Sequence, residues 1–150
     1  MNMIQGLDSY TVQSGLIYLN SLLRASILYA AETYHNLSES DLRMIESIEE
    51  DCLRQILKTG QKCPISIIYL ETSQLPARFH IWRMMAIYLH YLLRQKPNSL
   101  LHKFFNAQQN NPIRGDWISN MKRILTIIEI KLSFTDIKNM KKRVFMKKSR

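Results

Sequence analysis

Four carboxylates lie close together in one short segment of the chain: Glu46, Glu49, Glu50 and Asp51. Clustered carboxylates can hold a metal ion or act as a general acid and base. These four follow one another along a single predicted helix instead of converging from different elements, which is typical of a solvated acidic face. We therefore assign them no chemistry, and the sequence indicates neither a metal site nor a cofactor.

Nucleophilic and metal-binding side chains also lack the neighbours that they would need. Cys63 precedes a proline, but a catalytic cysteine requires a histidine base and an electropositive setting, and nothing in the sequence specifies either. His80 and His90 are ten residues apart, which matches no zinc spacing. The chain contains no Asp-Asp pair of the kind that holds the metal ions in a polymerase. We expect a buried structural thiol at Cys63 and no enzyme activity in the chain by itself.

The basic residues carry the strongest functional signal. The net charge is +9, and residues 1–58 hold 4 basic and 8 acidic side chains whereas residues 59–150 hold 17 basic and 4 acidic ones. Such asymmetry indicates an anionic partner, most often nucleic acid, for the C-terminal part. A solubilising surface with a basic tail would produce the same asymmetry, and charge alone does not separate the two interpretations.

Candidate phosphate contacts follow from positions near helix ends and on exposed helix faces. Arg78 lies in the first turn of a predicted helix, where the helix dipole disfavours a cation, so a nearby acid or a phosphate would explain it. The predicted nucleic-acid-binding residues are Lys58, Lys62, Arg78 and Arg83, with an outer patch of Lys141, Lys142, Arg143, Lys147 and Lys148.

The elements that position these residues are predicted to be helices. Apolar residues recur at helical spacing from Val12 to Ala30, with Asp8 or Ser9 as the N-cap. A second helix, Ser38–Lys58, begins with a capping box between Ser38 and Asp41 and ends before Gly60. The two helices are expected to form an antiparallel hairpin. The predicted core face of the second helix holds Leu42, Ile45, Ile48, Cys52, Leu53, Ile56 and Leu57.

Further helices are predicted over residues 65–71 and 76–95, over 100–109 with Asn98 or Ser99 as the cap, over 117–128 with Asp116 as the cap, and after a capping box at Ser133 and Asp136. In the 76–95 helix one side is expected to be core, and Arg78, Arg83, His90 and Arg94 are expected elsewhere on its surface. The expected core stripe is Phe79, Trp82, Met85, Ala86, Leu89, Leu92 and Leu93. Gly and Pro are scarce, which also favours helices. We expect an all-α, compact bundle of six or seven helices built around the N-terminal hairpin. The expected domains are a truncated lead-in (1–8), a helical domain (9–130) and a basic amphipathic C-terminal helix (131–150).

The expected compartment is intracellular, nucleus or cytoplasm. Residues 1–10 carry no signal-peptide pattern, and two cysteines make no disulfide framework. No apolar run approaches the roughly 20 residues that a membrane helix needs, so no membrane span is predicted.

Several short strings resemble the region after the catalytic palm in non-LTR (LINE-like) retrotransposon reverse transcriptases. Residues 28–33 (LYAAET) followed by residues 53–57 (LRQIL) are similar to an "LYG-A-E-T-W" string and an "L-R-x-I-L" helix end of that family. Ala30 and Tyr34 stand where the family commonly has Gly and Trp. The resemblance continues, in the same order as in the family, through Cys63-Pro64, Tyr69-Leu70-Glu71, Leu75-Pro76 and Gly115-Asp116-Trp117.

The resemblance implies a helical thumb and post-thumb region without fingers or palm. In such a polymerase the thumb lies against the RNA–DNA template–primer duplex, and the remaining reverse transcriptase domains would be partners in a longer chain. A hybrid duplex is recognised by its shape and its phosphates, which suits the charge pattern. Two alternatives stay open: a helical protein–protein interaction module, and a translated retroelement remnant without selected activity.

Overall fold

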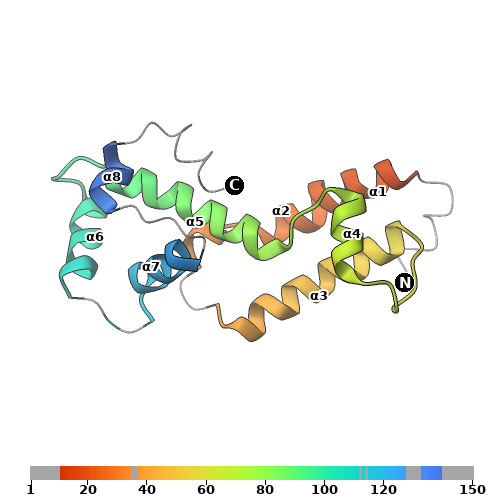
Figure 1. The fold of residues 1–150 in the computed structure, drawn as a ribbon. Helices are drawn as coiled ribbons and strands as arrows, with labels where there is room; N and C mark the ends of the chain where they lie inside the picture. Colours follow the sequence, from red (N-terminus) through yellow and green to blue (C-terminus); the bar gives the residue numbers. More distant parts are fainter. Residues whose placement is uncertain (1–10, 35–36, 112, 114, 128–132, 140–150) are drawn as a thin grey trace. The chain divides into compact units, whose positions relative to one another are not determined.

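The computed structural model describes residues 11–34, 37–111, 113, 115–127 and 133–139, and every regular element in these ranges is helical (Figure 1). The segments α1 (Val12–Tyr18), η2 (Leu19–Leu23, a π-helical turn) and α2 (Arg24–Ile27) form one uninterrupted helix, and a single 3₁₀ turn, η3 (Ala31–Thr33), follows it. The later helices are α3 (Glu39–Ile56), α4 (Ile65–Thr72), α5 (Ala77–Leu93), α6 (Leu100–Asn110), α7 (Trp117–Ile127) and α8 (Phe134–Asn139). With the α1–η2–α2 helix counted once and η3 left aside, the described residues form seven helices, which confirms the expected all-α class.

The chain divides into two compact units. The first unit comprises Met1–Tyr29 and Ser38–His80, and the second comprises Ala30–Leu37 and Ile81–Arg150. The chain therefore enters the second unit briefly at η3, returns to the first for α3 and α4, and leaves it within α5. Both expected domain boundaries, at 8/9 and 130/131, lie outside the described residues and stay predictions.

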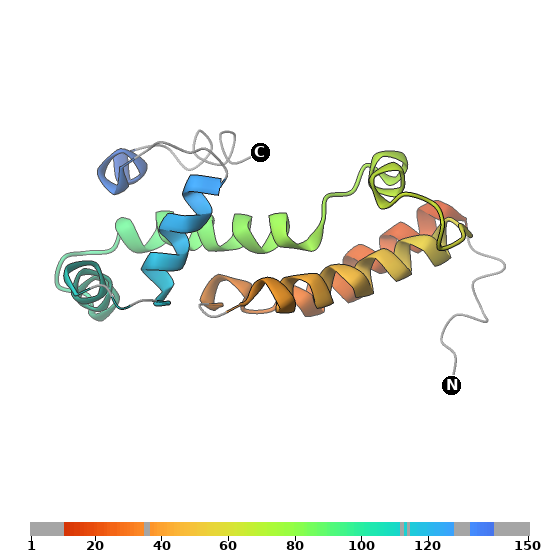
Figure 2. The same ribbon diagram turned by 60° about the horizontal axis from the view of Figure 1, so that its bottom comes forward.

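In the first unit, α1–η2–α2 and α3 pack as the predicted antiparallel hairpin (Figures 1 and 2). Gly15 near the start of the first helix lies against Ile56 at the end of α3, and Arg24 binds Glu49 further back along α3. Gly15 is required for this close approach, because a Cβ added there would lie 2.9 Å from both γ-carbons of Ile56. The turn before α3 has the predicted capping box, with Ser38 N donating to Asp41 Oδ2 at 2.8 Å.

The π-helical turn decides which residues of the first helix face α3. Gly15, Leu19 and Arg24 are its buried residues, so the spacing changes from four residues to five between Leu19 and Arg24. The Arg24 amide bonds the Leu19 carbonyl, the i→i−5 bond that defines a π turn. The extra residue therefore brings Arg24, and not Leu23, fully into the interface. Leu23 packs at the edge of the same apolar cluster.

The buried face of α3 differs from the predicted one. Leu42, Glu46, Glu49 and Leu53 are buried, whereas Ile48 is 48% exposed. The prediction that Glu46 and Glu49 belong to a solvated acidic face is therefore wrong. The physical reason is that both carboxylates have arginine partners from other segments, and the attraction and hydrogen bonds of those partners offset the large cost of taking the charges out of water.

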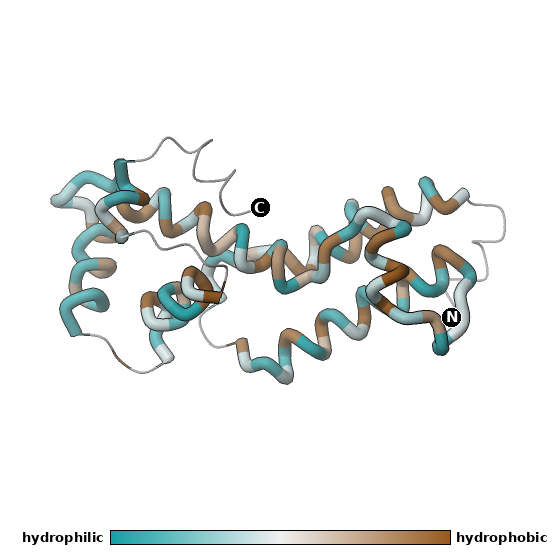
Figure 3. Tube along the Cα trace, viewed as in Figure 1, coloured by the Kyte–Doolittle hydropathy of each residue, from teal (hydrophilic) through white to brown (hydrophobic). Residues whose placement is uncertain are grey.

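The apolar core of the first unit lies at the end of the hairpin nearest α4. Leu19, Leu53 and Ile68 form its buried centre, one residue from each of three helices. Cys63 packs against this cluster and is half-buried, so it is less buried than expected. Hydrophobic residues cover much of α4 in Figure 3, in line with its ISIIYL sequence.

Two helices of this unit end with a residue in the left-handed conformation that is not glycine. Lys58 has a φ of 54°, and its neighbour Thr59 donates to the Arg54 carbonyl at 2.9 Å in a Schellman arrangement. Ser73 has a φ of 51° and ends α4 in the same way. The helix ends before Gly60 as predicted, but the left-handed residue after it is Lys58 and not the glycine.

Most predicted caps are confirmed. Ser99 caps α6, Asp116 caps α7 through the Ser119 amide, and Ser133 forms a capping box with Asp136 at α8. The first helix is the exception, since Thr11 accepts from the Ser14 amide at 3.3 Å, while the expected caps at positions 8 and 9 lie outside the described residues.

The prediction for α5 is partly wrong. Trp82, Met85, Ala86, Leu89, Leu92 and Leu93 are buried as expected, but Phe79 is 43% exposed and His90 is buried, although His90 was expected on the surface. Ile81, which the stripe did not include, is also buried. α7 buries Trp117, Ile118, Met121, Ile124 and Leu125, a regular 3.6-residue stripe that the sequence displays clearly.

Candidate functional site

Two of the predicted phosphate contacts, Lys58 and Lys62, lie on the loop between α3 and α4. Both side chains are exposed. The loop is held by Arg54, whose Nη1 donates to the Gly60 carbonyl at 3.2 Å and to the Cys63 carbonyl at 2.7 Å. The structure therefore places these two cations on one ordered loop of the first unit.

Arg78 is engaged by carboxylates. Its Nη2 donates to Glu46 Oε2 at 2.7 Å and to Glu39 Oε1 at 2.9 Å, and its side chain is only 17% exposed. The hydrogen bonds to Glu46 raise the pKa of Arg78, which keeps the guanidinium charged. Of the two explanations for a cation in the first turn of α5, the structure supports the nearby acid. Arg78 is thus a structural cation, and a phosphate would have to compete with two carboxylates for it.

Arg24 is itself buried and is the centre of a second network in the same unit. Its Nε donates to Glu49 Oε1 at 2.7 Å, and Nη2 donates to the same carboxylate oxygen and, at 2.9 Å, to the Leu75 carbonyl. Nη1 donates to the side chains of Asn20, at 2.8 Å, and Gln74. All five N–H groups of the guanidinium are therefore used.

Glu49 is the most buried charged residue in the described chain, with a relative exposure of 0%. Its Oε2 atom has no hydrogen-bond partner among the described residues, and neither does the buried hydroxyl of Tyr69. Burial and, next, the Glu49 charge raise the pKa of Tyr69, so the phenol stays protonated. This network joins α2, α3 and the segment after α4, and its role is structural.

The second unit presents its cations differently. Arg83 is exposed on α5 as predicted. Every described Lys and Arg of this unit is exposed, and two of its three described carboxylates, Asp116 and Asp136, cap helices through the Ser119 and Ser133 segments. The exposed cations are Arg83, Arg94, Lys96, Lys103, Lys122, Arg123 and Lys138. The predicted outer patch, Lys141, Lys142, Arg143, Lys147 and Lys148, lies outside the described residues and stays a prediction.

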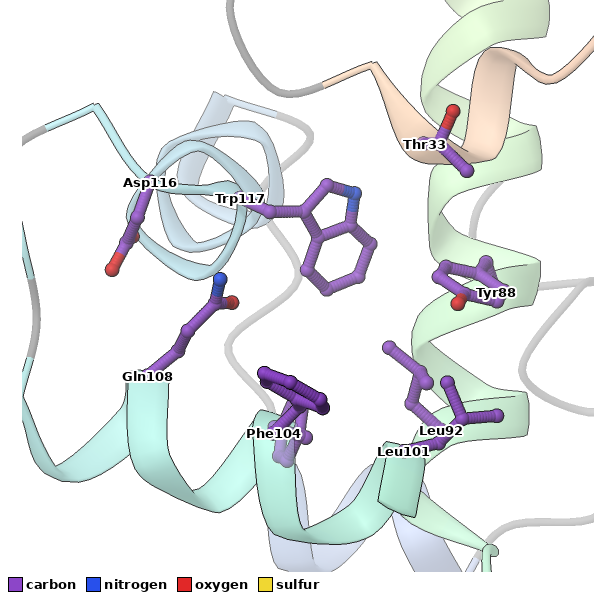
Figure 4. Close-up of a pocket in the computed structure, with 9 residues that line it drawn as sticks. Thr33, Tyr88, Leu92, Leu101, Phe104, Gln108, Asp116 and Trp117 are labelled. Carbon is purple, nitrogen blue, oxygen red and sulfur yellow. The ribbon is translucent and has the colours of Figure 1, made fainter.

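A pocket in the second unit was not found by sequence reasoning (Figure 4). It has a volume of about 430 Å³ and lies between α5, α6, η3 and the start of α7. Trp117, Phe105 and Leu92 are nearly buried, whereas Phe104 is 63% exposed. The lining residues are Thr33, Tyr88, Leu92, Leu101, Phe104, Phe105, Gln108, Asp116 and Trp117. The adjacent Phe104 and Phe105 were the available signal, because neighbouring residues on a helix point in directions roughly 100° apart, so the two rings cannot share one direction.

Trp117 is the anchored wall of this pocket. Its indole N–H donates to the Glu32 carbonyl at 2.9 Å, across 85 residues of sequence. Tyr88 meets the indole edge-on, with ring centroids 5.7 Å apart. Asp116, beside it, has a lowered pKa because Ser119 hydrogen-bonds its carboxylate, so it remains ionised near neutral pH.

Searches against known proteins identify no relative. No protein-family model matches the chain, and no curated protein or solved structure matches it. Within the described residues, no helix is long and apolar enough to cross a membrane. The same residues contain no group of three or more His, Cys, Asp or Glu side chains placed to hold a metal ion.

Proposed function

We propose that the chain is a non-catalytic helical module that binds the phosphate backbone of a nucleic-acid duplex, as the thumb of a non-LTR reverse transcriptase does. In this proposal it contributes to template–primer binding during RNA-directed DNA synthesis by a parent polymerase. The observation that carries the proposal is that the separate strings of the resemblance contact one another. Trp117 of the GDW string binds the Glu32 carbonyl of the LYAAET string, and Arg54 of the LRQIL string binds the Cys63 carbonyl.

The conformation of Ala30 supports the same proposal. Ala30 has φ 56° and ψ 21°, in the left-handed region that glycine enters at little cost. The family string commonly has Gly at this position. A backbone shape that favours glycine at that point is the shape that a member of the family would require.

The disposition of charge supports the choice of a nucleic acid as the partner. In the first unit Arg24 and Arg78 are paired with Glu49 and Glu46, so they add little to the external field. Lys58 and Lys62 are exposed on one loop, and the described cations of the second unit are all exposed. Such cations bind phosphates, and they do so without reading sequence. The revised contact set is therefore Lys58, Lys62 and Arg83, with the outer patch.

Fluorescence anisotropy with a labelled RNA–DNA hybrid tests the proposal over a range of salt concentrations. Log affinity should fall linearly with log salt, and each lost contact should reduce the slope by about one. The triple change of Lys58, Lys62 and Arg83 to Gln should therefore lower the slope by about three. Arg43→Gln is the matched control, because Arg43 is 72% exposed on α3 and is not a proposed contact.

A second variant separates binding by the folded surface from non-specific electrostatic binding by a cluster of cations. Changing the five outer-patch residues to Gln removes positive charge and leaves the rest of the chain unchanged. If this variant loses all binding while the triple variant binds like the unaltered chain, the folded surface is not the binding site and the proposal is refuted.

The pure protein should also show no primer extension with divalent metal present, and reproducible extension would contradict the non-catalytic assignment.

The helical interaction module remains the second candidate because of one observation. The first helix carries no charged residue from Thr11 to Leu23, yet Ile17, Tyr18 and Leu22 are 59%, 52% and 51% exposed. Exposed apolar side chains on one helix are a common feature of protein-binding surfaces. Association with a protein through this helix, together with no salt-dependent binding of the hybrid, would favour this candidate.

A further inference from the structure

The aromatic pocket of the second unit has a fixed floor and one exposed wall. Trp117 is oriented by its hydrogen bond to the Glu32 carbonyl and by its edge contact with Tyr88. Phe105 is fixed from behind by Phe134 of α8, with ring centroids 5.8 Å apart. Because these rings are held by the fold, a ligand entering the pocket would not have to order them.

The exposed wall is Phe104. Its side chain is 63% exposed, and Figure 4 shows it facing the same space as Trp117 and Tyr88. An exposed phenyl ring opposite a fixed indole and phenol is suited to a planar ring that enters from solvent, since aromatic rings stack or meet edge-on at such distances.

One neutral polar group stands at the edge of this apolar space. Gln108 comes from α6, and its amide lies near the indole in Figure 4. A glutamine amide both donates and accepts hydrogen bonds, and it pairs well with the edge of a nucleobase. The ligand that fits the lining is therefore a flat heterocycle with hydrogen-bonding atoms on its rim.

The charge of the unit indicates what this heterocycle is attached to. Every described Lys and Arg of the second unit is exposed, so an anionic ligand is attracted to the unit as a whole. A cationic ring or a basic peptide would be repelled by these cations. The one carboxylate of the lining, Asp116, already accepts hydrogen bonds from the Ile113 and Ser119 amides through its two oxygens. A base carried on a phosphate backbone satisfies both the aromatic lining and the charge.

The volume of the pocket is sufficient. A dry cavity of about 150 Å³ holds benzene, and this pocket has about 430 Å³. A two-ring base is larger than benzene and still fits within that space. We propose that the pocket accepts one unstacked base of the bound nucleic acid, at a single-stranded overhang or a frayed end. This inference rests on the proposed function, since it assumes that the chain binds a nucleic acid.

The test compares two hybrids that differ only in the overhang. One hybrid carries a short adenine overhang, and the other carries the same number of abasic nucleotides, so the phosphate charge is identical. The unaltered chain should bind the adenine overhang about tenfold more tightly than the abasic one, as expected for one base stacked on aromatic side chains. Phe104→Leu should abolish this difference and should leave the affinity for the abasic hybrid unchanged. Phe79→Leu is the matched control, because Phe79 is also exposed but does not line the pocket.

The outcomes distinguish the two proposals. Equal affinity for both overhangs, with salt-dependent binding of the hybrid retained, overturns the base pocket and leaves the proposed function standing. A base preference that survives Phe104→Leu overturns the assignment of that preference to this pocket. No salt-dependent binding to either hybrid overturns the proposed function, and the base pocket with it. A thermal melt of each variant verifies that the fold is intact.

Discussion

The buried pair between Arg24 and Glu49 gives the sharpest test of the structure. Removing the charge with Glu49→Gln leaves a guanidinium that is 7% exposed and faces neutral acceptors alone: those of Asn20, Gln74 and Leu75, and the amide oxygen of the new side chain. Breaking a buried ion pair from one side costs about 3–5 kcal/mol in the free energy of unfolding. A solvated acidic face predicts a change within about 0.5 kcal/mol for the same substitution. The two descriptions of α3 therefore differ by several kcal/mol.

Urea unfolding followed by circular dichroism measures this difference. Asp51→Asn is the matched control, because it removes a carboxylate from an exposed position of the same helix and should be close to neutral. A Glu49→Gln protein with the same unfolding midpoint and slope as the unaltered chain would show that the carboxylate is not buried against Arg24.

A double variant separates pairing from packing. Arg24→Met with Glu49→Leu replaces both charges by apolar side chains, and such replacements are often neutral or stabilising. Because the two residues are in contact, the double variant should be much more stable than the sum of the two single changes. Strict additivity of the two single effects would refute the pairing, whatever their individual sizes.

Three further predictions concern the backbone and the caps. Gly15→Ala should destabilise the chain because the new Cβ would lie 2.9 Å from Ile56, although helix propensity alone predicts a gain of about 1 kcal/mol. Gly60→Ala is the control, because a Cβ added there has no atom within 4 Å, and a Gly15→Ala protein that is more stable in urea would contradict the packing. Lys58→Gly should raise the free energy of unfolding by about 0.5–1 kcal/mol, because Lys58 has a positive φ, and it should lower the salt slope of hybrid binding by about one. A loss of stability would contradict the strained backbone at this position, and an unchanged salt slope would contradict the phosphate contact. The hydrogen bonds from Ser38 lower the pKa of Asp41, so the ionised Asp41 carboxylate stabilises the fold at neutral pH. This stabilisation is lost as the pH falls from about 4 through the lowered pKa. Asp41→Asn should therefore flatten the stability–pH curve in this range, and an unchanged curve would contradict the cap.

The sequence by itself determined the helices and most of their starts. Capping at Ser38, Ser99, Asp116 and Ser133 depends on bonds between residues three apart, so the local chain is sufficient to specify it. The buried residues of α7 also recur at a regular 3.6-residue spacing in the sequence. The antiparallel hairpin also followed, because two amphipathic helices joined by a short loop have few other ways to bury their apolar faces.

Only the tertiary structure decided which face of α3 is buried and what the arginines bind. No local rule marks a π-helical turn at Leu19–Leu23, and without that turn Arg24 would not point at Glu49. The same holds for Arg78, whose first-turn position indicated an anion but could not distinguish Glu46 from a phosphate. From the sequence alone a carboxylate is expected to be solvated, because burying an unpaired charge is very costly. Only the fold shows that a cation far away in the sequence lies beside it. Pairing across 25 and 32 residues is a property of the packed chain, so the charges that sequence reasoning assigned to the surface were settled by the fold.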